Sequence, residues 1–276
     1  MGENLGMKIA ALIVTHNPDF ILFQSINKLV SVVDYIIIID NNSSNRDVID
    51  KLATSLSKDQ LTVIYLQDNL GIGYALNRGV KYVQNLMLYD YVITLDQDTI
   101  LLVNNLKDII ERANKLQQKV GAIELPQRIF DDKSEFFETE SAITSGNIVN
   151  MEVYKFVKYR EEFFLDQIDF DFDFELRNAG FTFVSYNVKS IDHKLGVRGN
   201  KAVFEPSYRL YYIIRNSTVL FMEGKIGFNF YYRQIRYWAV NLLKEKGIFT
   251  VLKPLVVGFL HGIQKKMGKN FYFCPP

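Results

Sequence analysis

Two aspartates separated by one residue, Asp96 and Asp98, are the side chains with the clearest chemical potential in this sequence. They follow an apolar run at residues 91–95, which is typical of a buried strand in a parallel sheet. Side chains at i and i+2 of a strand point the same way, and ligands of open α/β sheets bind where the strands end. Paired carboxylates there suit a divalent cation held against a nucleotide diphosphate. An Asp-x-Asp pair can also be a turn or a helix cap.

Elements before and after these aspartates alternate at the lengths of βαβ units. Strands are predicted at residues 8–15, 35–40, 61–66 and 91–95, with helices at 19–32, 47–56 and 74–85. A helix at 104–118, strands at 121–125 and 181–185, a polar loop at 128–140 and helices after residue 208 follow. This pattern predicts an α/β fold with a doubly wound, mainly parallel sheet flanked by helices, and a C-terminal helical appendage.

Each of the first four predicted strands ends in polar residues, and in a parallel sheet these ends meet at one edge. The residues expected there include Thr15, Asn17, Asp40, Asn42, Asn69 and Asp96. An acid after the second strand can bind a ribose, although Asn and Ser beside it also favour a turn. Four such loops in register favour a nucleotide pocket. Gly71 and Gly73 are a poor dinucleotide fingerprint, and they more readily let a helix begin close to the sheet or the ligand.

A second group of carboxylates lies within residues 163–177. Its members are Asp166, Asp169, Asp171, Asp173 and Glu175. Helical spacing would put Asp166, Asp169 and Asp173 on one side, where like charges repel unless a substrate, cation or proton intervenes. We therefore expect a base or a ligand among them, although Asp173 and Glu175 could be solvated or pair with Arg177.

His193 is one of only three histidines and follows a predicted strand. A lone histidine is usually structural, but near a carboxylate site it is a reasonable third metal ligand. The stretch Thr144-Ser145-Gly146-Asn147 is compatible with the floor of a sugar site or with a simple turn.

Composition limits the remaining possibilities. The only cysteine, Cys274, permits no internal disulfide, which favours a reducing compartment. Residues 1–10 do not resemble a signal peptide. No apolar stretch reaches the roughly 20 residues that span a bilayer. The longest candidate, residues 247–263, is interrupted by Lys253, Pro254 and His261.

Charge and aromatic residues concentrate at the C-terminus. Residues 208–276 hold 11 Lys and Arg, 2 acids and 15 of the 38 aromatic residues, so their net charge is +9 and that of residues 1–207 is −8. We expect a catalytic domain at 1–207 and a basic, aromatic helical segment at 208–276. That segment is more typical of an anionic membrane surface than of nucleic-acid binding. A solvated basic face whose aromatic residues pack into the core is the alternative.

Together these motifs resemble glycosyltransferase family 2 and, within it, the bacterial rhamnosyltransferase group. The resemblance covers residues 9–216 and rests on Val14-Thr15-His16-Asn17, Ile39-Asp40-Asn41-Asn42-Ser43-Ser44, Asn69-Leu70-Gly71-Ile72-Gly73-Tyr74-Ala75-Leu76-Asn77, Leu95-Asp96-Gln97-Asp98-Thr99, Thr144-Ser145-Gly146-Asn147, Phe164-Leu165-Asp166-Gln167-Ile168-Asp169-Phe170-Asp171, His193-Lys194-Leu195-Gly196 and Tyr211-Tyr212-Ile213-Ile214-Arg215-Asn216.

The resemblance implies a GT-A fold, a nucleotide-sugar donor, Mg²⁺ or Mn²⁺, and inversion at the anomeric carbon. It implies that Asp98 is the principal metal ligand, that Asp96 contacts donor and metal, and that His193 completes the metal site. Asp169 matches the catalytic base, but Asp171 replaces a glutamate common in the group, so either aspartate could face the acceptor. The matching donor-pocket positions are Thr15, Asn17, Asp40, Asn42, Asn69, Gly71, Asn77, Asp96 and Gln97.

These expectations describe a metal-dependent inverting glycosyltransferase that uses dTDP-L-rhamnose and a lipid-linked or growing cell-surface polysaccharide acceptor. It would be cytoplasmic and peripheral on the inner face of the cell membrane. Alternatives are transfer of another hexose from a UDP-sugar, a haloacid dehalogenase-type phosphatase, or a non-catalytic membrane-associated binding module. The phosphatase motif needs Thr four residues after the first Asp, whereas Thr99 stands three after Asp96.

Overall fold

The computed structural model describes residues 6–193, 197–198, 201–202 and 207–273. They form two compact units, each built from segments that are not contiguous in sequence. The first unit comprises Met1–Asn69, Ala75–Tyr159 and Phe172–His193, and the second comprises Leu70–Tyr74, Arg160–Asp171 and Lys194–Pro276. Cys274 and Lys194 to Gly196 lie outside the described residues.

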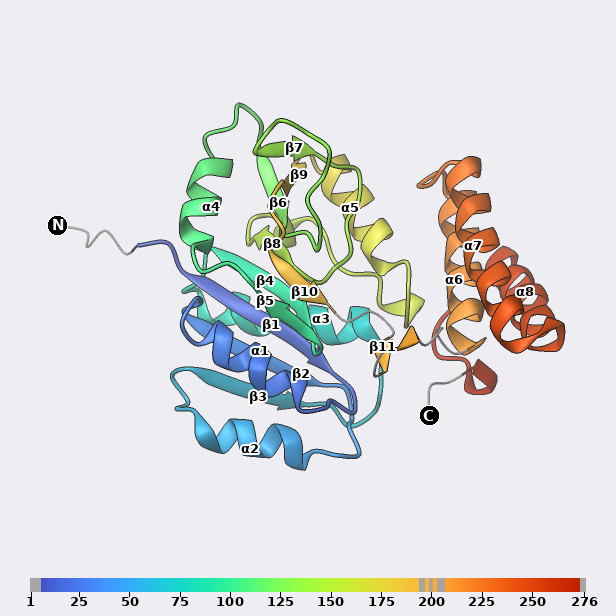
Figure 1. Ribbon diagram of the computed structural model, residues 1–276, viewed down its shortest axis with the longest axis horizontal. Helices are drawn as coiled ribbons and strands as arrows, with labels where there is room; N and C mark the ends of the chain where they lie inside the picture. Colours follow the sequence, from blue (N-terminus) through green and yellow to red (C-terminus); the bar gives the residue numbers. More distant parts are fainter. Residues whose placement is uncertain (1–5, 194–196, 199–200, 203–206, 274–276) are drawn as a thin grey trace. The chain divides into compact units, whose positions relative to one another are not determined.

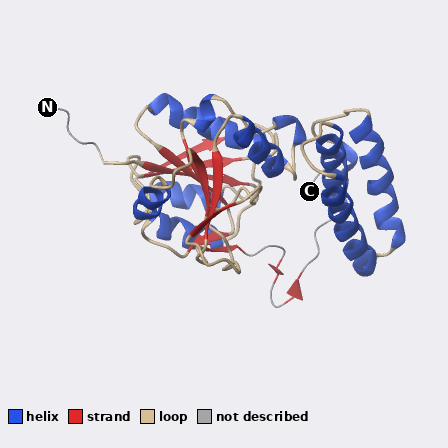
Figure 2. Ribbon diagram, turned by 90° about the horizontal axis from the view of Figure 1, so that it is seen from above, coloured by secondary structure: helices blue, strands red, loops and turns tan. Residues whose placement is uncertain are grey.

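The first unit is built on an eight-stranded sheet with the order β3-β2-β1-β4-β8-β6-β9-β7 (Figures 1 and 2). The strands are β1 Ile9–Thr15, β2 Tyr35–Asp40, β3 Leu61–Tyr65, β4 Tyr91–Asp96, β6 Val120–Glu124, β7 Phe136–Glu138, β8 Asn147–Asn150 and β9 Thr182–Tyr186. Strands β3, β2, β1 and β4 are parallel neighbours, as are β6 and β9. The remaining pairs are antiparallel. The predicted doubly wound, mainly parallel sheet is therefore confirmed.

The central strands are apolar because helices cover both faces of the sheet. Every residue of β2 is buried, and so are the first five residues of β1. The register aligns Thr15 with Asp40, and Val14 with Asp96. Consequently the polar residues that end β1, β2 and β4 meet at the carboxyl edge of the sheet, as the sequence predicts.

The flanking helices are α1 Ile21–Leu29, α2 Asp47–Ser55, α3 Ile72–Leu86, α4 Leu106–Ala113 and α5 Ile168–Asn178, with short 3₁₀ turns η1 Val153–Lys155 and η2 Glu161–Phe163. An apolar stripe at helical spacing holds α4 in place through Leu106, Ile109, Ile110 and Ala113, all buried. Most predicted helices are present, but α4 ends at Ala113 instead of residue 118. The stripe of buried residues at helical spacing also ends there.

Short strands differ most from the sequence expectations. Strand β5 (Thr99–Leu101) pairs with β10 (Ile191–His193) in a two-stranded antiparallel sheet. Strand β7 lies inside the segment predicted to be a loop, and it pairs with β9 at the edge of the main sheet. Three-residue strands lack a periodic pattern of their own and form because a partner supplies their hydrogen bonds.

The second unit contains the helices α6 Ser207–Met222, α7 Phe228–Lys246 and α8 Ile248–Ile263, the 3₁₀ turn η3 Phe271–Phe273, and the two-residue strands β11 Val197–Arg198 and β12 Lys201–Ala202 (Figure 1). Two glycines let α8 lie close to α6. A Cβ on Gly258 would stand 2.8 Å from the carbonyl oxygen of Tyr211, and one on Gly262 would stand 2.8 Å from that of Arg215. Among the described helices, none is both long and apolar enough to cross a membrane.

Candidate active site

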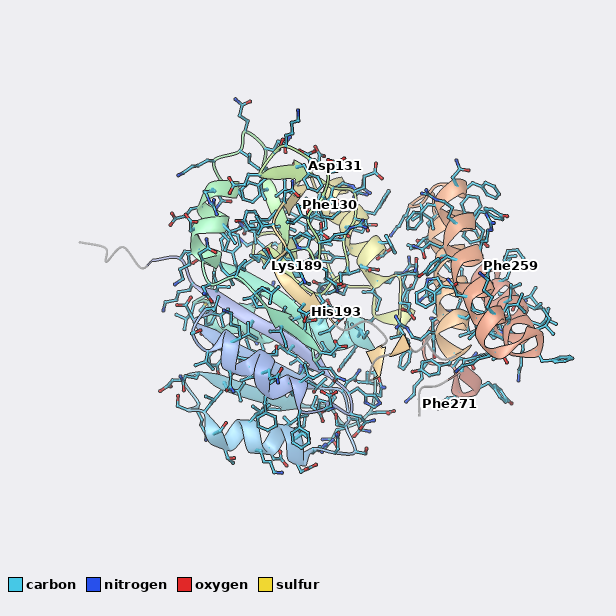
Figure 3. All side chains as sticks on the ribbon, viewed as in Figure 1. Phe130, Asp131, Lys189, His193, Phe259 and Phe271 are labelled. Atoms are coloured by element: carbon cyan, nitrogen blue, oxygen red, sulfur yellow. The ribbon has the colours of Figure 1, made fainter. Side chains whose placement is uncertain are left out.

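The carboxylates of Asp96 and Asp98 and the imidazole of His193 come together at the end of β4. One ligand atom from each of the three lies within 4.8 Å of the other two. His193 Nε2 is 3.7 Å from Asp96 Oδ2, and Nδ1 is 3.5 Å from Asp98 Oδ1. His193 is buried, whereas both aspartates are partly exposed, so the group is open on one side. Figure 3 labels His193 at the end of β10.

Local structure explains why three residues far apart in sequence meet here. Asp96 ends β4, and Asp98 lies in the two-residue turn before β5. The antiparallel register of β10 with β5 places His193 directly opposite Thr99. The short sheet formed by β5 and β10 therefore places the imidazole of His193 next to Asp96 and Asp98.

A chain of buried hydroxyls supports this group. The Thr99 hydroxyl is hydrogen-bonded to His193 Nδ1 and lies 2.7 Å from the Ser145 hydroxyl. Ser145 Oγ also accepts a hydrogen bond from the backbone N–H of Asp96 at 2.9 Å. Thr99 and Ser145 are both buried. The segment that contains Ser145 thus helps to fix the end of β4, where Asp96 lies and the turn with Asp98 begins.

The donor set fits a divalent cation. Two carboxylates and one imidazole are ligands that Mn²⁺ and similar metals accept, whereas Mg²⁺ favours oxygen alone. A metal-binding histidine commonly has its second ring nitrogen fixed by a hydrogen bond, and Thr99 supplies that bond to Nδ1 of His193. Nε2 is then the ring nitrogen available to a metal.

The loops after β1 and β4 are joined by a reciprocal pair of hydrogen bonds. The Gln97 side chain accepts from the His16 N–H at 2.8 Å and donates to the His16 carbonyl at 3.2 Å. Asn17 has a φ of 50° and accepts from the N–H and hydroxyl of Ser44 at 2.8 and 2.9 Å. Asn17 and Gln97, both predicted to bind the nucleotide-sugar donor, therefore lie at the sheet edge that carries Asp96.

Asp40 lies at the same edge but is completely buried. Its carboxylate accepts hydrogen bonds from the Thr15 hydroxyl at 3.3 Å and the Ser43 N–H at 3.1 Å, and Arg46 Nε is 3.4 Å away. The Ser43 hydroxyl also donates to it. Asp40 and Thr15 thus stabilise the turn after β2. A turn at this position is the alternative that the sequence left open.

The other residues predicted to bind the nucleotide-sugar donor also contact protein groups. Asn42, with a φ of 64°, accepts a hydrogen bond from Arg46 Nη2 at 3.0 Å. Asn69 Oδ1 accepts from the Asn41 side chain at 2.9 Å, which links the loops after β2 and β3. On α3, the Asn77 amide both donates to the carbonyl oxygen and accepts from the N–H of Tyr159, at 2.8 and 3.0 Å. Asn77 therefore fixes the backbone at Tyr159.

Gly71 belongs to the second unit. Its φ is +90°, and a Cβ there would stand 2.5 Å from the carbonyl oxygen of Phe164. A glycine is required for this close approach of two backbones. The Ile72 N–H donates to that carbonyl at 2.9 Å, so the glycine allows α3 to begin against the segment that precedes α5.

The acidic segment does not form a single charged face. Helix α5 begins at Ile168, so Asp166 lies outside it, with a φ of 60°. Asp166 pairs with Arg209 of α6. Within the first unit, Asp173 is buried and accepts a hydrogen bond from the Ala142 N–H at 3.0 Å. Repulsion is avoided because these carboxylates face different partners.

Asp169 and Asp171, the two candidates for the base, occupy the first turn of α5 and differ in environment. Asp171 is buried, and its carboxylate lies 2.6 Å from Lys225 Nζ and 3.4 Å from Arg160 Nη1. Asp169 is only partly buried. Its Oδ1 accepts a hydrogen bond from the Phe170 N–H at 3.0 Å. Of the two carboxylates, that of Asp169 is the more accessible to a substrate.

Glu223 completes the ion-pair network around Asp171. Arg160 contacts both of its carboxylate oxygens, at 2.6 and 3.1 Å, and Lys265 lies 3.2 Å from one of them. The pKa of Glu223 is lowered to about 2, first by the hydrogen bonds from Arg160. Sequence reasoning missed Arg160, Glu223 and Lys225. Their only signal is charge, and in a basic segment that does not identify a partner.

The chain matches a known protein family over most of its first unit. Residues 11–187 match the family model described as glycosyl transferase family 2. This match spans more than half of the chain and includes Asp96 and Asp98, so the chain belongs to glycosyl transferase family 2. Membership in the family does not favour the phosphatase alternative. No protein of curated function shows significant sequence similarity to the chain.

Solved structures share the fold. Mannosyltransferase PcManGT from Pyrobaculum calidifontis, in complex with GDP-Man and Mn²⁺, superposes with a TM-score of 0.65 at 9% identity, covering 95% of this chain and 88% of that one. S. aureus TarS 1–349 in complex with UDP-GlcNAc gives 0.62 at 13% identity, covering 94% and 82%. GalNAc-T7 with UDP, GalNAc and Mn²⁺ gives 0.61 at 13%, covering 95% and 57%. The predicted GT-A type of fold is confirmed.

Proposed function

We propose that this glycosyltransferase transfers a sugar from a nucleotide-sugar donor to a hydroxyl acceptor with inversion at the anomeric carbon. The observation that carries the proposal is the group formed by Asp96, Asp98 and His193 at the carboxyl edge of the sheet, in a chain of glycosyl transferase family 2. Structural neighbours with a bound nucleotide sugar, one of them also with Mn²⁺, support the same substrate class.

In the proposed reaction Asp169 is the base. Its carboxylate takes the proton of the acceptor hydroxyl as that oxygen bonds to the anomeric carbon. The bond from the anomeric carbon to the diphosphate oxygen breaks, and its electron pair leaves with the nucleoside diphosphate. Asp171 is a poorer candidate, because two cations surround its buried carboxylate. A divalent cation held by Asp96, Asp98 and His193 would supply positive charge to the leaving diphosphate.

Mn²⁺ is the metal that we favour over Mg²⁺, because a histidine belongs to the donor set. The donor that we favour is dTDP-L-rhamnose, on the basis of the sequence motifs shared with the rhamnosyltransferase group. A UDP-hexose is the alternative. In either case we propose a lipid-linked or growing cell-surface polysaccharide as the acceptor.

A panel of nucleotide sugars tests this proposal. Purified protein with Mn²⁺ is incubated with dTDP-rhamnose, UDP-hexoses and GDP-mannose, and nucleoside diphosphate release is measured with and without a glycolipid acceptor. Release from dTDP-rhamnose alone, abolished in Asp98→Ala, supports both donor and metal site. Release from a UDP-hexose instead would support the proposed reaction but refute the assignment of rhamnose as the donor sugar. Donor binding without turnover in either the wild type or Asp169→Asn would favour a non-catalytic binding module.

We also propose that residues 208–276 attach the enzyme to an anionic membrane surface on the cytoplasmic face. The side of α8 that faces away from α6 is apolar, at helical spacing. Its exposed residues are Ile248, Phe249, Leu252, Val256, Phe259, Leu260 and Ile263 (Figure 3 labels Phe259). Exposed lysines lie before, beside and after this face, at Lys244, Lys246, Lys253, Lys265 and Lys266. An apolar face bordered by cations matches the chemistry of an anionic bilayer interface.

Vesicle co-sedimentation tests the membrane proposal. The full chain is mixed with neutral phosphatidylcholine vesicles or with vesicles that contain phosphatidylglycerol. We expect salt-sensitive binding to the anionic vesicles, lost when Phe249 and Phe259 are both replaced by Ser. Phe20→Ser, at a residue that is 71% exposed in the first unit, is the matched control. Equal binding to both vesicles, or a vesicle-free dimer dissociated by the double substitution, would refute the proposal.

A further inference from the structure

Residues 163–167, which run from the last residue of η2 to the start of α5, have an unusual backbone. Phe164 has a φ of 63° and a ψ of −57°. The Leu165 N–H donates to the Phe163 carbonyl at 2.7 Å, which closes a γ-turn of positive φ that residues other than glycine seldom adopt. Asp166 and Gln167 follow with φ values of 60° and 64°. Such conformations persist only where the surrounding structure imposes them.

Two consecutive residues of α6 impose this conformation. Asn216 Nδ2 lies 2.8 Å from the carbonyl oxygen of Leu165, 2.9 Å from that of Asp166 and 3.1 Å from that of Phe163. Arg215 Nη2 donates to the Phe163 carbonyl at 2.7 Å. The backbone carbonyls of the strained segment therefore converge on one amide and one guanidinium.

Both side chains are themselves immobilised. Arg215 and Asn216 are completely buried, and Arg215 Nε donates to Asn216 Oδ1 at 2.9 Å, which leaves the Asn216 NH₂ group directed at the carbonyls. Arg215 Nη1 donates to the Gly268 carbonyl at 2.7 Å. The guanidinium also lies over the rings of Tyr211 and Tyr212, 5.5 and 4.9 Å from their centroids. The arrangement leaves neither side chain free to change rotamer.

The strained segment leads directly into the turn that carries Asp169. Gln167, the last residue with positive φ, is followed by Ile168, where α5 begins. The conformation of residues 163–167 consequently sets the direction in which the first turn of α5, and the Asp169 carboxylate on it, emerge.

We propose that Arg215 and Asn216 are positioning residues for glycosyl transfer. They hold residues 163–167 in the strained conformation that directs Asp169 at the acceptor hydroxyl. This inference rests on the proposed role of Asp169 as the base. A base must lie within hydrogen-bond reach of the proton it abstracts, and a displacement of about 1 Å costs about 10²-fold in rate.

The inference separates catalysis from donor binding. Donor and metal are proposed to bind through Asp96, Asp98 and His193 of the first unit, whereas Arg215 and Asn216 belong to the second. Without the Asn216 amide, the segment can relax out of its left-handed conformation and move Asp169. We therefore expect kcat to fall while the affinity for nucleoside diphosphate and Mn²⁺ stays unchanged.

The test uses Asn216→Ala in the full chain, with Ser217→Ala as its control. Ser217 is equally buried on the same helix, and its hydroxyl has no hydrogen-bond partner among the described residues. For Asn216→Ala we expect kcat per folded molecule to fall roughly 10- to 100-fold, with the Kd for nucleoside diphosphate unchanged. Ser217→Ala should match the wild type in both. Arg215→Lys, which keeps the buried charge, is measured if Asn216→Ala does not fold.

A double-mutant cycle excludes a purely structural role. In an Asp169→Asn background, Asn216→Ala should cause no further loss of kcat, because the residue through which it acts is already disabled. An equal loss in both backgrounds, or a loss accounted for by unfolded protein, would overturn the inference. If Asp169→Asn itself keeps wild-type kcat, the base assignment fails. If Asp169→Asn is inactive and Asn216→Ala fully active, only the positioning role fails.

Discussion

Lys225 Nζ lies 2.6 Å from a carboxylate oxygen of Asp171, whose side chain is 5% exposed. This ion pair gives Asp171 a different environment from that of Asp169. The carboxylate of Asp171 is enclosed between Lys225 and Arg160, which suits a structural anchor for the first turn of α5. Asp169, two residues earlier, is more accessible.

Substitution of the two aspartates should therefore have different effects. Asp169→Asn should lower kcat by about 10²- to 10⁴-fold, the usual contribution of a general base, with little change in stability. Asp171→Asn should lower the free energy of unfolding by about 1.5–3 kcal/mol, because the buried side chain loses its charge-assisted contacts to Lys225 and Arg160. Steady-state kinetics and urea denaturation of both variants measure the difference. A stable but inactive Asp171→Asn would reverse the assignment.

Acid should destabilise the protein in part through Glu223. Hydrogen bonds from Arg160 lower its pKa from 4.5 to about 2. The charged form therefore stabilises the fold fully above pH 4.5, and this contribution is lost as the pH falls toward 2. Between pH 6 and pH 3 the loss amounts to about 2 kcal/mol. Urea denaturation at both pH values should show this drop in the wild type and a smaller one in Glu223→Gln; equal drops would contradict the prediction.

Thr99 should tune metal affinity without being a ligand. Its hydroxyl is hydrogen-bonded to Nδ1 of His193, and loss of such a partner typically weakens metal binding by about 10- to 100-fold. We expect Thr99→Val to raise the Kd for Mn²⁺ by that factor in a calorimetric titration of the purified protein. Thr54→Val, at an exposed position of α2, is the control. An unchanged Kd in Thr99→Val would exclude His193 as an oriented ligand.

Packing of α8 on α6 should depend on Gly262. A Cβ at this position would stand 2.6 Å from the Cβ of Thr218 and 2.8 Å from the Arg215 carbonyl oxygen. Because neither atom belongs to a flexible side-chain end, we expect Gly262→Ala to lower the free energy of unfolding by about 1–3 kcal/mol. Gly6→Ala, with no atom within 4 Å of its added Cβ, should be neutral. Thermal unfolding of both variants provides the comparison.

Much of the fold was predictable because long apolar runs identify buried strands. Strand β2 has the bounds expected from the sequence, and the ends of β1 and β4 meet as expected. The short strands β5, β7 and β10 were not predictable, because each forms only when a distant segment pairs with it. The approach of His193 to Asp98 depends on one of these pairings, so sequence could nominate the histidine without explaining its position.

The acidic segment shows a different limit of sequence reasoning. Asp166 matches helical spacing, yet it lies before α5, because residues 164, 166 and 167 adopt positive φ values. None of these residues is a glycine, so no local signal marks the conformation. The groups that stabilise it, Arg215 and Asn216, lie about 50 residues further on. At Asp40, by contrast, the Asn and Ser residues beside it already favour a turn, and its hydrogen bonds stabilise that turn.

The segment Arg160–Asp171 folds with residues that the ribosome adds much later. By the time Asp169 is synthesised, the strands β1 to β4 with Asp96 and Asp98 are already present in the chain. Arg215 and Asn216, which donate hydrogen bonds to the carbonyls of residues 163–166, are synthesised later. The Gly268 carbonyl, which accepts a hydrogen bond from Arg215, follows later still. A nascent chain that ends before α6 therefore contains Asp96, Asp98 and His193 but lacks the groups that fix residues 163–167. The conformation of the segment that carries Asp169 is therefore settled late in synthesis, when α6 and Gly268 are in the chain.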